Sequence, residues 1–138
     1  MNMADSRHKE HAMKIFKRTI LPVLVAAVWI ALSEFVRNEL ILKAYWTGHY
    51  RRLGLVFPSE PLNGAVWGLW SLLFAVWIFI IIKKFSLLQT TLLAWFAGFV
   101  LMWVVIWNLN VLPPGLLVYA VPLSLLETFV AAVIIKKL

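Results

Sequence analysis

The chain contains no cysteine. Disulfides, thiol nucleophiles and thiolate metal sites are therefore excluded, and with them thiol redox chemistry and cysteine-dependent catalysis. Acidic residues are also scarce, since six Asp and Glu face 13 Lys and Arg and leave a net charge of +7. The basic residues flank apolar runs, which is typical of membrane topology and argues against nucleic-acid binding.

Charge is missing from long stretches of the chain. Hydrophobic residues make up 63% of the sequence, whereas a soluble domain is usually about half apolar. A helix needs about 20 apolar residues to cross a bilayer. The runs 61–82, 85–110 and 113–135 meet that length, and the run 19–33 meets it if the helix continues through residue 42. We therefore predict an all-α integral membrane protein, a single four-helix transmembrane bundle over residues 1–138, whose spans lie near 19–42, 61–82, 86–108 and 113–135.

The first run has a second interpretation. A basic segment, a short apolar core and Ala31-Leu32-Ser33 resemble a signal peptide with its cleavage site. The apolar pattern continues beyond Ser33, however, in Phe35, Val36 and residues 40–42. This continuation favours a spanning helix with a polar end.

The distribution of Lys and Arg predicts the orientation of the bundle. Five basic residues lie in 1–18, and pairs follow the second and fourth runs at 83–84 and 136–137. We therefore place 1–18 and both termini in the cytoplasm, in what we expect to be a bacterial inner membrane. Residues 43–60 contain the aromatic residues Tyr45, Trp46 and Tyr50, together with Gly48 and Gly54. They are expected to form a partly helical, interfacial loop on the outer face.

Glu127 is the only charged residue in the run 113–135. A rise of ~1.5 Å per residue places its carboxyl group roughly 5 Å from the bilayer midplane. A carboxylate there costs several kcal/mol, and desolvation favours its protonated form unless a cation lies beside it. Glu127 is therefore predicted to be either a functional acid or a polar contact between helices. Pro122 is expected to kink the same helix.

Other polar residues in the spans extend this candidate site. Glu34, Arg37 and Asn38 share one helical face, and they either mark a polar helix end or point into the bundle. Gln89 is a possible hydrogen-bond partner of Glu127. The predicted substrate-binding or proton-coupling residues are Glu127, Glu34, Arg37, Asn38, Gln89, Tyr119, Trp67, Trp70 and Trp103.

Small residues follow helical spacing in the second and third spans. Their ridge predicts close approach of another helix, while the Trp residues beside it either pack between helices or line a cavity. The predicted helix-packing residues are Gly64, Gly68, Ser71 and Gly98.

No catalytic arrangement is recognisable in the sequence. His8, His11 and His49 all lie outside the spans, which argues against haem ligation in the bundle, and there is no nucleotide-binding motif. We therefore predict no cofactor and no metal; the sequence leaves enzymatic activity open but favours a protein that is not an enzyme. Two hypotheses remain: a small protein that transports a small cation or a hydrophobic solute with an intramembrane acid, or a non-catalytic accessory or assembly subunit. Besides the lipid bilayer, the expected partner is a second copy or another membrane protein.

Overall fold

The computed structural model describes residues 3–138, so the first two residues of the predicted basic segment lie outside it. The described chain is helical and contains no strand, which confirms the all-α prediction. The elements are α1 (Met3–Ile15), η1 (Phe16–Ile20), α2 (Leu21–Phe35), η2 (Val36–Ile41), α3 (Lys43–Arg52), α4 (Pro61–Ile81), α5 (Leu87–Trp95), η3 (Phe96–Val100), α6 (Leu101–Asn108) and α7 (Leu117–Lys137).

Within residues 3–138, four continuous helices are long and apolar enough to cross a membrane: Met3–Ile41, Pro61–Ile81, Leu87–Asn108 and Leu117–Lys137. The protein is therefore an integral membrane protein. The first of these helices includes the basic segment, which continues the span as α1 instead of forming a separate tail. The fourth begins four residues later than the predicted position 113, because the turn before it includes Gly115 at φ 79°, a conformation that favours glycine.

Three short π-helical segments interrupt the spans. In η1 the Leu21 N–H bonds to the Phe16 carbonyl five residues earlier. Pro22 explains this widening, because it has no N–H for the carbonyl four residues before it. The second segment, η2, carries Arg37, and the third, η3, carries Gly98. Such π turns often occur at functional sites.

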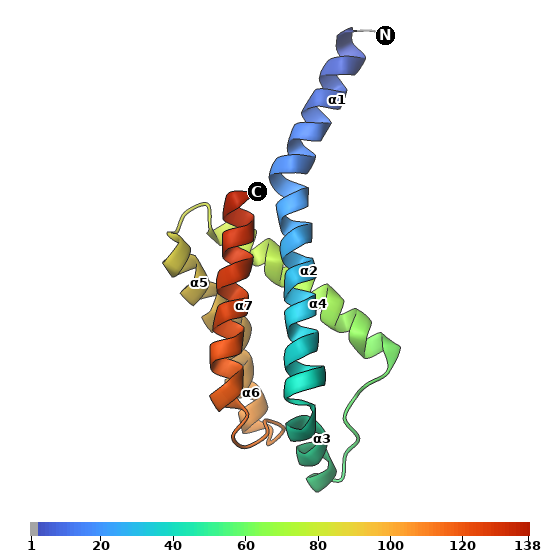
Figure 1. Cartoon of the computed structure of the whole chain (residues 1–138), viewed down its shortest axis with the longest axis vertical. Helices are drawn as coiled ribbons and strands as arrows, with labels where there is room; N and C mark the ends of the chain where they lie inside the picture. The colour runs from blue at the N-terminus through green and yellow to red at the C-terminus, as the bar shows by residue number, and fades with distance from the viewer. Residues whose placement is uncertain (1–2) are drawn as a thin grey trace.

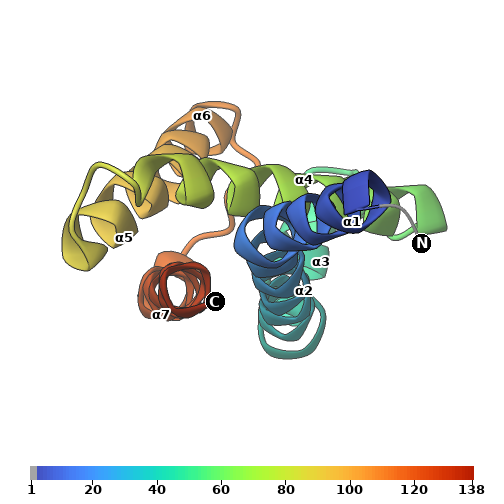
Figure 2. The ribbon, with the colours of Figure 1, turned by 90° about the horizontal axis from the view of Figure 1, so that it is seen from above.

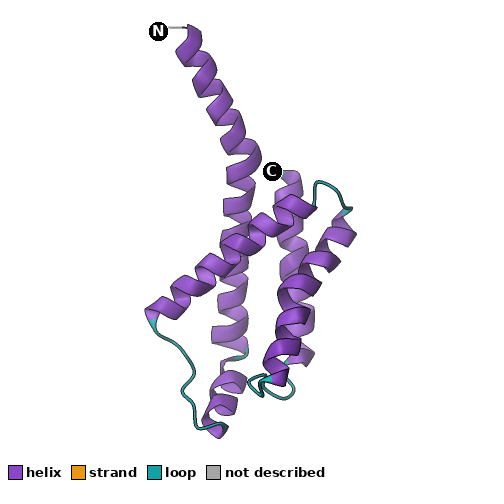
Figure 3. Ribbon diagram, turned by 180° about the vertical axis from the view of Figure 1, so that it is seen from behind, coloured by secondary structure: helices purple, strands orange, loops and turns teal. Residues whose placement is uncertain are grey.

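The bundle is built around α2 and α7. These helices run side by side, and α4 crosses them obliquely (Figures 1 and 3). Helix α2 packs on both α4 and α7, while α5 packs on α7. The buried contacts are rich in alanine, which lets helix axes approach closely in a membrane. These alanines are Ala26, Ala75, Ala94, Ala120, Ala131 and Ala132.

Helix α3 closes one end of the bundle, next to the α6–α7 connection, whereas α1 and the C-terminus lie at the other end (Figure 1). The His49 ring bonds to the Asn110 carbonyl over 2.7 Å, and Tyr45 packs on Tyr119 with ring centroids 5.9 Å apart. The predicted interfacial loop is thus helical over Lys43–Arg52, and residues 55–59 are irregular. We refer to the two ends as the α3 end and the α1 end.

The predicted packing residues divide into two groups. Ser71 is buried, and a Cβ atom on Gly98 would lie 2.6 Å from Cε2 of Phe74, so Gly98 permits a close contact between η3 and α4. Gly64 and Gly68 have no atom within 4 Å of a built Cβ among the described residues. They lie on the half of α4 that extends away from the bundle (Figure 2). Their ridge therefore has no partner helix within one copy.

Candidate functional site

A charged cluster lies between the first and fourth spanning helices. Arg37 Nη1 donates to Glu127 Oε2 over 2.7 Å, and Arg37 Nη2 donates to Glu34 Oε1. The exposed fractions are 0% for Glu127, 4% for Glu34 and 5% for Arg37. We call these three residues the charged centre. The sequence left open whether these charges mark a polar helix end or point into the bundle. The structure places Glu34 and Arg37 inside the bundle.

The charged centre forms because the first spanning helix and α7 carry their charged residues on the faces that pack together. Glu34 and Arg37 are three residues apart on one face of the first helix, so their side chains meet within it. Glu127 is central in α7, with ten residues of the helix on either side. Small buried residues next to it, Ser124, Thr128 and Ala131, allow α2 to approach. Because 90 residues separate Arg37 from Glu127, the ion pair joins distant parts of the chain.

Neutral side chains add further hydrogen bonds to the two carboxylates. Ser33 Oγ donates to Glu127 Oε2 over 2.8 Å. Asn38 Nδ2 donates to Glu34 Oε2 over 2.8 Å, and Trp46 Nε1 of α3 donates to Asn38 Oδ1 over 3.0 Å. A chain of hydrogen bonds therefore runs from α3 through Asn38 to the Glu34 carboxylate.

One oxygen of the charged centre is left over. Glu127 Oε1 is buried and has no hydrogen-bond partner among the described residues. An unsatisfied buried acceptor is unfavourable, and the charged centre as a whole contains two carboxyl groups for one guanidinium. The sequence predicted a neutral acid unless a cation lay nearby, and the structure supplies that cation as Arg37. It supplies only one cation, however, for two acids.

Aromatic rings support the guanidinium. Arg37 Cζ lies 5.0 Å from the centroid of the Phe99 ring, a cation–π distance. Phe99 in turn packs on Trp70 at 5.5 Å and on Trp103 at 5.8 Å. Trp70 stacks on Phe74 at 4.9 Å. We call these four rings the aromatic cluster; its contacts correspond to the packing interpretation of Trp70 and Trp103.

The other predicted site residues lie elsewhere. Trp67 is 43% exposed at the edge of the aromatic cluster, and Tyr119 lies near the α3 end against Tyr45. Gln89 Oε1 accepts from the Ser86 N–H over 3.1 Å as part of the helix cap of α5. The predicted bond from Gln89 to Glu127 is therefore wrong. The Ser86–Gln89 spacing is that of a capping box, which competes for this side chain.

Sequence reasoning missed four residues of the site: Trp29, Ser33, Trp46 and Phe99. Trp29 Nε1 donates to the Glu127 backbone carbonyl over 3.0 Å. One signal was available, since Trp29, Ser33 and Arg37 follow one another at intervals of four and so share a helical face. No comparable signal marks Trp46 or Phe99, which reach the site only through the packing of other elements.

A groove of about 180 Å³ runs beside the charged centre. It is lined by Trp29, Leu32, Ser33, Val36, Arg37, Ile41 and Leu123. Two of these residues, Ser33 and Arg37, donate to the Glu127 carboxylate, and Trp29 donates to the Glu127 backbone carbonyl. Leu32, Val36 and Ile41 are exposed on the surface of the bundle, so the groove connects that surface with the centre. Its volume is enough for several water molecules at about 30 Å³ each.

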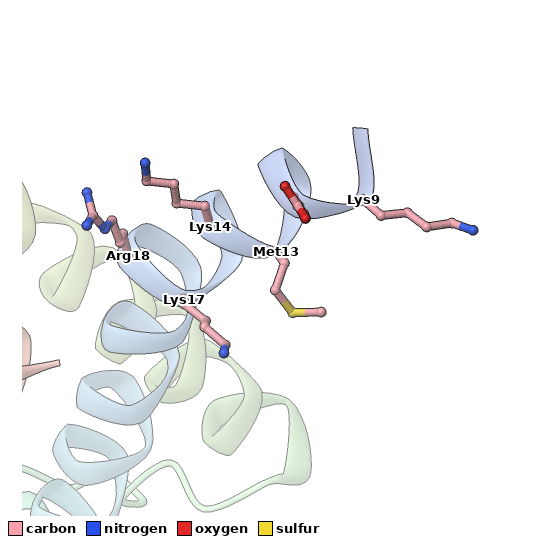
Figure 4. Close-up of a pocket in the computed structure, with 6 residues that line it drawn as sticks. Lys9, Met13, Lys14, Lys17 and Arg18 are labelled. Atoms are coloured by element: carbon pink, nitrogen blue, oxygen red, sulfur yellow. The ribbon is translucent and has the colours of Figure 1, made fainter. Parts of the chain in front are cut away.

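A larger hollow of about 410 Å³ lies at the α1 end, lined by Lys9, Glu10, Met13, Lys14, Lys17 and Arg18. All six residues belong to α1 and η1, and their side chains point away from a single helix (Figure 4). No other element of the described chain contributes to its lining. We therefore take the charged centre, and not this hollow, as the candidate site.

The fold and the site together define a polytopic membrane protein with a buried glutamate–arginine–glutamate centre between two spanning helices. No protein family model, curated protein or solved structure matches the chain.

Proposed function

We propose that the protein transports a small cation or a hydrophobic solute across the membrane, and that Glu34, Arg37 and Glu127 form its coupling site. The observation that carries this proposal is the excess of one carboxyl group in a buried centre that joins two spanning helices. The protonation or cation occupancy of such a centre changes the attraction between the helices that carry it.

A purely structural role explains the charged centre less well. Replacing a buried ion pair by apolar residues of similar size often leaves stability unchanged or improves it. A second acid that the guanidinium does not neutralise adds desolvation cost without adding an ion pair of its own. Intramembrane ionisable groups usually serve ion pathways or proton relays, and the groove beside Ser33 and Arg37 offers access from the bundle surface.

The test is solute-linked proton flux in proteoliposomes that contain a trapped pH-sensitive dye. Candidate monovalent cations and apolar amines are added outside under a set pH gradient. We expect flux from the wild type and loss to the level of empty liposomes in Glu127→Gln. The matched control is Glu39→Gln, because Glu39 lies outside the charged centre, in η2, and pairs with Lys43 at 2.8 Å. Equal flux from the wild type and Glu127→Gln refutes the coupling role of Glu127, and wild-type flux no greater than that of empty liposomes refutes the transport function.

A second candidate function is supported by a different observation. Gly64 and Gly68 form an open ridge on the exposed half of α4, and in lipid such ridges accept a partner helix. An accessory or assembly subunit, associated with a second copy or another membrane protein, would use this ridge. In crosslinking of membranes, Gly68→Leu should abolish the adduct, while Gly48→Leu in α3 should not. Unchanged crosslinking of Gly68→Leu contradicts this role.

We also propose that the α1 end faces the cytoplasm of a bacterial cell. The α4–α5 connection and the C-terminus both lie toward the end that carries α1 (Figure 1). The first contains the Lys83–Lys84 pair, and the second follows the Lys136–Lys137 pair. The cysteine-free chain allows a single cysteine to be placed at either end, so labelling of intact cells with a membrane-impermeant thiol reagent tests the orientation. A cysteine in place of Ser59 should react, and one in place of Ser86 should not.

A further inference from the structure

We infer that the charged centre binds a single proton, which the carboxyl groups of Glu34 and Glu127 share beside Arg37. This inference rests on the proposed function for its biological purpose and identifies a proton as the ion of the coupling site. The first argument is charge. With both acids ionised the buried centre carries a net charge of −1, and one proton makes it neutral. A neutral centre avoids most of the cost of burying an uncompensated charge in a low dielectric.

The second argument is geometry. Glu127 Oε2 accepts from two donors, Ser33 Oγ at 2.8 Å and Arg37 Nη1 at 2.7 Å. Within residues 3–138 no donor bonds to Glu127 Oε1, which is therefore the oxygen free to carry a proton. A carboxylic O–H needs an acceptor, and the Glu34 carboxyl group is the other acid bound by the same Arg37 guanidinium. Two carboxyl groups bound to one buried guanidinium share a proton because they cannot both ionise at low cost.

The site suits a proton better than a metal cation. Small cations such as Mg²⁺ and Ca²⁺ take six or more oxygen ligands. Within residues 3–138, no three His, Cys, Asp or Glu side chains form a group that could hold a metal ion. The guanidinium that contacts both acids would also repel a metal. A proton needs one oxygen to carry it and one to accept its hydrogen bond.

Other titratable groups do not compete for this role. The segments packed on the centre, Pro61–Ile81 and Leu87–Asn108, contain no titratable side chain. In α7 the remaining ones are Tyr119 near the α3 end and the lysines at the C-terminus. On the first helix, Glu39 is bound to Lys43 and is not buried. The proton is therefore assigned to the Glu34–Glu127 pair.

Infrared spectroscopy of the full-length protein in lipid at neutral pH tests this assignment. A protonated carboxyl group has a C=O band separate from that of a carboxylate. We expect one buried protonated carboxyl in the wild type. We expect the band to be lost in both Glu34→Gln and Glu127→Gln, because each variant leaves one carboxylate opposite one guanidinium. Glu39→Gln is the matched control and should keep the band.

Two further variants sharpen the test. Arg37→Gln leaves two acids without a cation and should double the band. Ser33→Ala removes a neutral donor and should retain it. Absence of the band in the wild type overturns the inference, as does its survival in both Glu34→Gln and Glu127→Gln. If the band behaves as expected but no flux is measured in proteoliposomes, the proposed transport function fails while the proton site stands. If flux depends on Glu127 but the wild type lacks the band, the transport function stands and the proton site fails.

Discussion

Removal of the Arg37 guanidinium provides the most direct measure of the energetics of the charged centre. Arg37→Met keeps an extended apolar stem but removes the donors to Glu34 and Glu127. Both acids are then buried with no cation, and loss of one partner from a buried pair typically costs about 3–5 kcal/mol. We expect the free energy of unfolding to fall by about that amount at neutral pH. The loss should shrink as the pH falls, because holding both acids protonated in the folded state then costs less.

The matched control is the exposed pair Lys43–Glu39. Its ion-pair distance, 2.8 Å, is close to the 2.7 Å of Arg37–Glu127, but its side chains are 53% and 31% exposed instead of 6% and 0%. Lys43→Met should therefore cost only about 0–1 kcal/mol, as is usual for exposed pairs. Because the two ion-pair distances are nearly equal, the difference between the two losses of unfolding free energy measures the effect of burial.

The assay is reversible unfolding in mixed micelles, followed by far-ultraviolet circular dichroism. A triple variant, Arg37→Met with Glu34→Gln and Glu127→Gln, removes every charge of the centre and should recover most of the lost stability. Equal losses from Arg37→Met and Lys43→Met refute the reasoning. So does a triple variant less stable than Arg37→Met, because the cost would then come from lost packing and not from unpaired charge.

Three other predictions concern the surroundings of the charged centre. Gly98→Leu should destabilise the protein by about 1–3 kcal/mol through crowding of the aromatic cluster, whereas Gly64→Leu should not; the same unfolding assay compares them. Trp46→Phe removes one hydrogen bond and should cost about 0.5–1.5 kcal/mol, which the same assay measures. The Tyr119 hydroxyl, through a hydrogen bond and then charge repulsion, raises the pKa of Tyr45. In an ultraviolet titration of the phenols, Tyr119→Phe should therefore lower the pKa of Tyr45.

Much of the fold could be predicted from the sequence because the bilayer imposes a simple length rule. Runs of about 20 uncharged residues have no other stable arrangement in lipid, so the four spans were recognisable. The helical continuity at residue 18, where the basic segment meets the first span, could not be predicted. A change from basic to apolar residues indicates a membrane boundary, but it does not indicate where a helix begins. The chain stays helical there, from Met3 into α2.

The site could be predicted as residues but not as contacts. Glu34, Arg37 and Glu127 were identifiable because charge is costly in an apolar run. The contact between Arg37 and Glu127 depends on which helices are neighbours in the bundle. A hydropathy pattern does not show which helices those are. Gln89 illustrates the limit. It was predicted as a possible partner of Glu127, yet its amide oxygen accepts a hydrogen bond from the nearby Ser86 N–H.

The bond from Trp46 to Asn38 has a mechanical consequence. At 3.0 Å it is near the middle of the range for an N–H···O bond, and a displacement of about 1 Å would break it. Asn38 would then lose the contact that orients its amide toward Glu34. A molecule that displaces α3 would in this way alter the electrostatic field at the Glu34 carboxyl group. Movement of α3 is therefore coupled, through Trp46 and Asn38, to the electrostatic environment of the charged centre.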